Sequence, residues 1–78
     1  MKMGTKERIS EIEERMGKLR GMKDNCYRII GIYRGLNHRN SEFFARLYER
    51  NLERLKKEYE ELESERKELS SMIERREA

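Results

Sequence analysis

The sequence predicts an all-α fold: an antiparallel two-helix hairpin of the coiled-coil kind. Glu, Arg and Lys dominate its 78 residues and proline is absent, a composition that favours helix. Apolar residues recur at heptad spacing in both halves of the chain, as they do in helices that pack as coiled coils. Because only 35% of the residues are hydrophobic and 45% are charged, we expect one small domain over residues 1–78 with a narrow buried stripe.

The first helix is predicted over about residues 5–34. Thr5 is its expected N-cap, and Lys23 is the one residue out of character on the stripe. An alternative breaks this helix at Gly21, where residues 21–25 contain a possible C-cap and a possible new N-cap. The heptad phase does not shift there, which favours a continuous helix. With Ile9 at position a, the apolar residues at a and d are Ile9, Ile12, Met16, Leu19, Cys26, Ile30 and Tyr33.

The second helix is predicted over about residues 41–76, capped by Asn40 or Ser41. Arg66 interrupts its stripe. Close to the turn, Phe43, Phe44 and Leu47 are expected to thicken the buried apolar face. The stripe itself comprises Ala45, Tyr48, Leu52, Leu55, Tyr59, Leu62, Leu69 and Ile73.

The segment 35–40 is predicted to be the turn. Gly35 suits the left-handed C′ position that ends many helices, because it has no Cβ to clash with the backbone. Leu36 then supplies the apolar contact that accompanies such an end. The two helices are therefore expected to run antiparallel.

Self-association is the first predicted partnership. A hairpin with one apolar stripe per helix leaves apolar surface in water, and two such hairpins commonly pair into a four-helix bundle. We therefore expect a homodimer. The residues assigned to the oligomer interface are Ile12, Leu19, Cys26, Ile30, Tyr48, Leu52, Leu55 and Leu62.

Charge is distributed unevenly along the chain. Residues 15–57 carry twelve Lys/Arg against four Asp/Glu, whereas residues 58–78 carry four against eight. In a hairpin, the basic block lies at the turn end and the acidic block lies with the termini. Lys and Arg in a strip can follow phosphates, so nucleic-acid binding is predicted at the turn end and along the outer face of helix 2. The residues assigned to it are Arg28, Arg34, Arg39, Arg46, Arg50, Arg54 and Lys57.

Two alternatives for this strip stay open. Three i,i+4 pairs (Glu42–Arg46, Glu53–Lys57 and Arg54–Glu58) are expected to neutralise part of it, which would leave an ordinary solvated surface. The strip also suits an acidic protein partner. The predicted function is accordingly a non-enzymatic binding or assembly module that binds nucleic acid, with a coiled-coil protein–protein adaptor or structural assembly protein as the alternative.

No enzyme, metal or cofactor is predicted. His38 is the single histidine, and no second ligand stands at helical spacing from it. Cys26 is the single cysteine, and its place on the apolar stripe predicts a reduced, buried thiol. Tyr27 and His38 are candidates for stacking on a single strand.

The glycines form a short internal repeat. Gly17 and Gly31 each begin a G-x-x-R-G-(apolar) stretch, fourteen residues apart. A glycine inside a helix costs ~1 kcal/mol relative to alanine, so the repeat suggests close approach by a neighbouring helix or a phosphate backbone. Chance is the alternative.

No membrane segment is predicted. The longest apolar cluster, residues 29–33, is far too short to span a bilayer, and the first residues do not resemble a signal peptide. We expect a cytoplasmic protein. High Glu, Arg and Lys without Gln is typical of hyperthermophile proteins, which suggests a thermophilic archaeon or its virus as the source.

Overall fold

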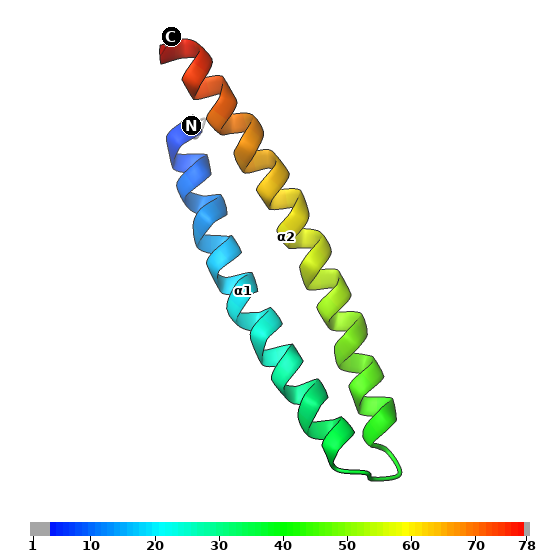
Figure 1. Cartoon of the computed structure of the whole chain (residues 1–78). Coiled ribbons are helices and arrows are strands. Elements are labelled where there is room, and N and C mark those ends of the chain that lie inside the picture. Colours follow the sequence, from blue (N-terminus) through cyan, green and yellow to red (C-terminus); the bar gives the residue numbers. More distant parts are fainter. Residues whose placement is uncertain (1–3, 78) are drawn as a thin grey trace.

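The computed structural model describes residues 4–77, which form a hairpin of two helices. α1 spans Thr5–Gly35 and α2 spans Ser41–Glu77. The two helices run antiparallel, so both ends of the chain lie at one end of the molecule and the turn lies at the other (Figure 1). α2 has 37 residues against 31 in α1, and it extends past α1 at the terminal end. Residues 1–3 and 78 of the predicted domain lie outside the described residues.

The molecule is a rod. Its extents are 59 × 21 × 16 Å, and its radius of gyration is 17.6 Å. A compact domain of this length would have a radius of gyration of about 11–12 Å. The length follows from α2, because a helix rises ~1.5 Å per residue. In the part of the chain that the structure describes, no helix has a stretch that is both long and apolar enough to cross a membrane.

The start of α1 differs from the prediction by one residue. Gly4, in an extended conformation, occupies the N-cap, and no side chain caps the helix there. The Arg8 amide donates the first helical hydrogen bond to the Gly4 carbonyl oxygen, 2.9 Å away. Thr5 is therefore the first helical residue, and the expected Thr5 cap is wrong.

The turn bends at a residue other than the expected one. Gly35 is the last residue of α1, and no described glycine has a positive φ. Asn37 has φ 49° instead. Asn is the residue type other than glycine that most readily adopts this left-handed conformation. Leu36 stays right-handed and donates its amide hydrogen to the Tyr33 carbonyl oxygen.

Ser41 fastens the turn to the start of α2. Its hydroxyl donates to the His38 carbonyl oxygen (2.6 Å) and accepts from the His38 amide (3.1 Å). The imidazole Nδ1 of His38 accepts from the Asn40 amide. Ser41 is buried, and these hydrogen bonds satisfy its hydroxyl. His38 thus has a structural role in the turn, and its predicted stacking on a single strand stays a prediction.

The core is a seam between the two helices. It follows the predicted heptad positions: the buried side chains occupy a and d, because those positions face the partner helix once in every two turns. Three tyrosines and Leu62 pack at the edges of this seam, half-buried: Tyr33, Tyr48 and Tyr59. The buried apolar side chains are Ile12, Met16, Leu19, Cys26, Ile30, Ala45, Leu52 and Leu55.

Two basic residues occupy seam positions. The Lys23 ammonium lies over the ring of Tyr59, with its Nζ 4.0 Å from the ring centroid. Arg66 reaches Glu13 on the other helix, 3.9 Å away, although its Nε is buried without a hydrogen-bond partner. Both side chains are half-buried. The long aliphatic stems therefore fill the seam while the charged groups lie at its edge.

α1 is continuous through Gly21. The alternative break at this residue is therefore excluded. A Cβ placed on Gly17, Gly21, Gly31 or Gly35 would meet nothing within 4 Å. Nothing in the described chain approaches these four glycines closely, so the hairpin itself does not account for the repeat.

Candidate functional site: the turn half of the hairpin

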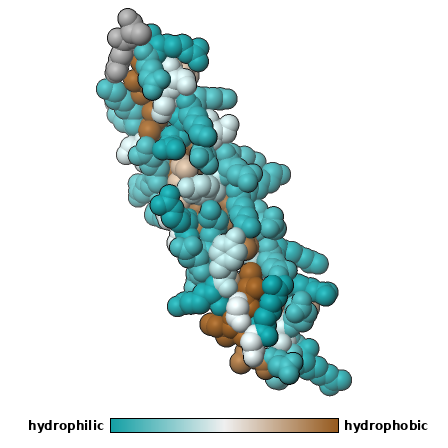
Figure 2. Space-filling model, in the orientation of Figure 1, coloured by the Kyte–Doolittle hydropathy of each residue, from teal (hydrophilic) through white to brown (hydrophobic). Residues whose placement is uncertain are grey.

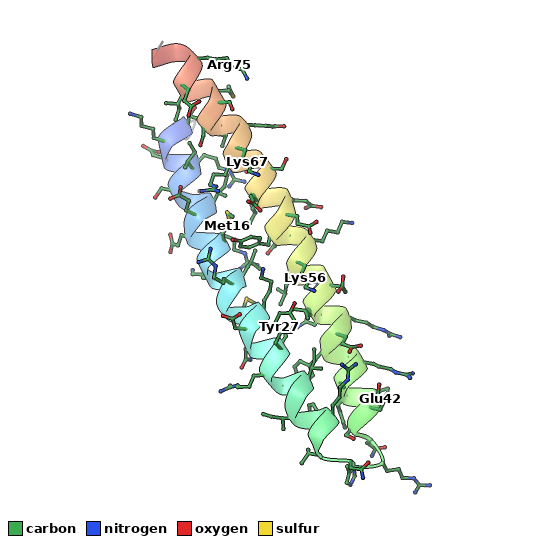
Figure 3. All side chains as sticks on the ribbon, in the orientation of Figure 1. Met16, Tyr27, Glu42, Lys56, Lys67 and Arg75 are labelled. Carbon is green, nitrogen blue, oxygen red and sulfur yellow. The ribbon has the colours of Figure 1, made fainter. Side chains whose placement is uncertain are left out.

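On each side of the seam, two rows of residues face each other, one row from each helix. The members of a row follow one another at seven-residue spacing, next to the a and d positions. On the first side, every described pair between the rows is polar. Arg34 forms an ion pair with Glu49, and Lys56 lies 5.4 Å from the ring centroid of Tyr27 (Figure 3). Beside these pairs, Arg20 donates a hydrogen bond to the hydroxyl of the seam residue Tyr59 at 3.1 Å. We refer to this side as the closed flank.

The tyrosines of the closed flank act on the cations beside them. The hydrogen bond to Tyr59 raises the pKa of Arg20, and a hydrogen bond to Tyr27 raises the pKa of Lys56. Both shifts are upward, from ordinary pKa values at which Arg and Lys are already charged in the physiological pH range. Tyr27 thus interacts with the ammonium group of Lys56 in the hairpin.

The second side of the seam differs between the terminal half and the turn half of the rod. It is formed by one row of residues on α1 and one on α2, each at seven-residue spacing. In the terminal half, the rows are joined by ion pairs: Arg8 contacts Glu65 at 2.8 Å and Arg15 contacts Glu58 at 3.0 Å. These pairs are one heptad apart on both helices, so they share one geometry. In full, the rows are Arg8, Arg15, Met22, Ile29 and Leu36 on α1, and Phe44, Asn51, Glu58, Glu65 and Met72 on α2.

In the turn half, the α1 row and Phe44 of the α2 row are apolar, Asn51 of the α2 row is uncharged, and the apolar Leu47 follows Phe44 by three residues on the same helix. Met22, Leu36, Phe44 and Leu47 are exposed, and Ile29 is half-buried. We call these five residues the open flank. Figure 2 shows hydrophobic surface gathered toward the turn end of the visible face, with hydrophilic surface over most of the remainder. A monomer would leave this apolar surface in water.

A groove of ≈ 580 Å³ lies beside the open flank. Its wall is an aromatic column: Tyr33 stacks on Phe44, with ring centroids 5.3 Å apart, and on Tyr48, with centroids 5.9 Å apart. Its rim carries two guanidinium groups, and none of the described residues that line it is acidic. The lining residues are Tyr33, Phe44, Leu47, Tyr48, Arg50, Asn51 and Arg54.

The residues assigned to nucleic-acid binding are all exposed, but they differ in whether a nearby side chain forms an ion pair or a hydrogen bond with them. Arg34 is held by Glu49 on the closed flank, and Arg46 lies 3.5 Å from Glu42. Arg28 and Arg54 each donate to an asparagine three residues earlier. Asparagine is neutral, so the charges of these two arginines are not compensated there.

Three of the assigned cations form no ion pair with the described residues. Within the part of the chain that the structure describes, Arg39, Arg50 and Lys57 have no acidic partner. Figure 3 shows nitrogen-tipped side chains projecting outward from the turn half of α2. The cationic surface of the turn half thus rests on five side chains: Arg28, Arg39, Arg50, Arg54 and Lys57.

Of the three i,i+4 pairs expected to neutralise the strip, one forms. Arg46 pairs with Glu42 as predicted. Glu53 pairs with Lys56 in place of Lys57, and Glu58 pairs with Arg15 of the other helix in place of Arg54. The strip is consequently less neutralised than the sequence suggested.

The residues assigned to the oligomer interface lie along the seam of the hairpin itself. Six of the eight are buried within the single chain, whereas Tyr48 and Leu62 are half-buried. Cys26 is a free, buried thiol, and the Asn51 amide lies 3.9 Å from its sulfur. The apolar surface that remains for another chain is chiefly the open flank.

Phe43, Phe44 and Leu47 were expected to thicken the buried apolar face close to the turn, and this expectation is wrong, since Leu47 is 43% exposed. Phe43 is 62% exposed, and Phe44 is also exposed. Phe43 occupies an outward heptad position, so its contact is with Phe44 beside it (ring centroids 5.6 Å apart). The signal that identifies this surface is the pair of seven-residue rows, in which ionic residues give way to apolar ones.

The terminal half has the opposite charge. Glu60, Glu61, Glu68 and Glu74 form no ion pair with any described residue. Among the described residues, no three His, Cys, Asp or Glu side chains come together as a metal site.

Comparison of the chain with known protein families, curated proteins and solved structures gave no match.

Proposed function

We propose that this chain is a non-enzymatic module that binds nucleic acid through the cationic surface of its turn half. The observation that carries the proposal is the set of unpaired cations Arg39, Arg50 and Lys57. In the terminal half, Arg8 and Arg15 instead join the two helices through Glu65 and Glu58. Cations kept free of carboxylates can displace the counterions of a phosphate backbone, and that displacement favours binding.

The geometry of α2 supports this proposal. Arg46, Arg50 and Lys57 lie on outward positions, and a rise of ~1.5 Å per residue places them over about 16 Å of helix. Arg39 extends the series into the turn. Contacts of this kind go to phosphates and carry no base specificity. We therefore propose binding that does not depend on nucleic-acid sequence.

An electrophoretic shift assay on single-stranded and duplex probes, repeated over a series of salt concentrations, tests the proposal. Replacing Arg39, Arg50 and Lys57 together by Gln should weaken binding and flatten the log–log salt dependence by about 2–3. The matched control replaces Lys6, Lys67 and Arg75, three exposed cations near the terminal end, by Gln. Equal losses in the two triple variants, or no shift at ~50 mM salt, would contradict the proposal.

Pairing of two hairpins into a homodimeric four-helix bundle stays a prediction, as do the cytoplasmic location and the thermophilic source. Such a bundle would have to bury the open flank of each copy, because the seam is already filled. Light scattering during gel filtration measures the mass of the particle. A dimer has twice the 9.6 kDa of the chain.

A further inference from the structure

The heptad pattern changes along the second side of the seam. In the terminal half, the flanking rows are ionic at Arg8, Arg15, Glu58 and Glu65, before Met72 near the end of α2, and this ionic stretch is the pattern of two helices that need no further partner. In the turn half, Met22, Ile29 and Leu36 add an apolar row on α1. Apolar residues at a, d and one flanking position are typical of helices in bundles, which are covered by another helix. The turn half therefore has the pattern of an incomplete bundle.

The charge around the groove indicates what completes it. Arg50 and Arg54 lie on its rim, and no acidic residue lines it among those described. Within residues 4–75, Arg50 has no acidic partner, and the one side chain to which Arg54 donates is the neutral Asn51. A ligand with carboxylates on either side of an apolar stripe would pair with both guanidinium groups.

We propose that the open flank docks an amphipathic helix of another protein, with its apolar stripe in the groove and Glu or Asp side chains against Arg50 and Arg54. The groove runs beside α2 from Phe44 to Arg54, about 15 Å or three helical turns. A helix lying along it presents apolar residues at i, i+3 or i+4, and i+7, the spacing of helix-in-groove recognition.

A second copy of the chain, which the predicted homodimer would place on the open flank, fits this surface less well than an acidic helix does. Two copies related by a two-fold axis bring the same patch against itself, so Arg50 and Arg54 of both copies would enter one interface. Like charges in an interface oppose association. An acidic helix, in contrast, compensates these charges.

A nucleic acid also fits the groove less well than it fits the outer strip. Leu47, Met22 and Leu36 are aliphatic and offer no ring on which a base could stack. The Tyr33 ring is stacked against Phe44 and Tyr48. The inference therefore goes beyond the proposed function and does not depend on it.

The test uses two labelled synthetic helices that differ only in charge. Both carry Leu at heptad positions a and d; one has Glu at the flanking positions and the other has Lys. Fluorescence anisotropy with the full chain should show the Glu peptide binding at least about tenfold more tightly than the Lys peptide. Replacing Arg50 and Arg54 by Gln should remove most of this preference.

Two serine substitutions separate docking from general effects. Leu47 and Met72 are each 43% exposed on α2, but only Leu47 lines the groove. Leu47→Ser should weaken binding of the Glu peptide about tenfold or more, whereas Met72→Ser should leave it unchanged. Circular dichroism confirms that both variants retain their helices. If Leu47→Ser alters circular dichroism, the Arg50/Arg54 variant still tests the docking site.

Three outcomes would overturn the inference. Equal binding of both peptides, or binding of neither at ~100 µM, would remove the acidic helix as the occupant. A dimer that Leu47→Ser, but not Met72→Ser, converts to a monomer would assign the open flank to a second copy. Loss of nucleic-acid binding in Leu47→Ser with peptide binding intact would assign the groove to nucleic acid. Failure of the proposed function would be detected separately, in the electrophoretic shift assays of the triple Gln variants.

Discussion

The Nζ atom of Lys23 lies 4.0 Å from the centroid of the Tyr59 ring, across the seam of the hairpin. A lysine at a seam position would be unfavourable among aliphatic side chains, because its charge would lose water without compensation. The face of an aromatic ring attracts the ammonium group. Tyr59 therefore allows the heptad frame to continue through Lys23.

A double-mutant cycle with Lys23→Met and Tyr59→Leu measures this relationship. We expect a favourable coupling of about 0.5–1 kcal/mol in the free energy of unfolding, obtained from urea titrations followed by circular dichroism. Tyr59→Phe is the control, because it keeps the ring and removes only the hydroxyl that accepts from Arg20. A coupling of zero would show that the contact adds nothing beyond packing.

The positions of the helices were predictable because their signal is local. Helices predicted over about residues 5–34 and 41–76 are observed at Thr5–Gly35 and Ser41–Glu77. The heptad phase also favoured continuity through Gly21, which the structure shows. A periodic apolar pattern specifies such elements without knowledge of the rest of the chain.

The partners of individual charges were less predictable, since they depend on the register of one helix against the other. Glu58 has Arg54 one turn away on its own helix, but it pairs with Arg15, 43 residues away in sequence. The short turn sets that register. The bend at Asn37 was also missed, because Gly35 satisfies the same local rule and the sequence alone does not rank the two.

The seam should carry most of the stability of the hairpin. Leu19 is 0% exposed and Leu47 is 43% exposed, and both lie inside helices. Leu19→Ala is expected to lower the free energy of unfolding by about 2–5 kcal/mol. Leu47→Ala, with the same change of side chain, should alter it by no more than about 0.5 kcal/mol in the monomer. Urea titrations of both variants make the comparison, and similar losses would show that Leu47 is buried in solution, as it would be in a dimer.

The turn should be sensitive at Asn37. Its φ of 49° costs an ordinary L-residue roughly 1–2 kcal/mol, and a β-branched residue is the most strained there. Asn37→Val is expected to lower the melting temperature, whereas Asn37→Gly should maintain or raise it. The same pair of substitutions at Asn40 is the control, because Asn40 does not have a positive φ. Equal effects at the two positions would place the sensitivity elsewhere in the turn.

The helical glycines should be the easiest positions at which to stabilise the fold. A Cβ on Gly17, Gly21 or Gly31 meets nothing within 4 Å, and none of these residues has a positive φ. Alanine there reduces the freedom of the unfolded chain and favours helix. Each Gly→Ala substitution is therefore expected to add about 0.5–1 kcal/mol to the free energy of unfolding, measured as an increase in the urea midpoint.

The triple alanine variant also tests why these glycines are present. If a partner approaches the α1 backbone closely at the repeat, the added methyl groups will weaken binding to nucleic acid or to the Glu peptide while the free chain becomes more stable. Opposite changes in stability and binding would identify the glycines as a contact surface. Increased stability with both binding activities unchanged would instead show that neither ligand contacts this face of α1.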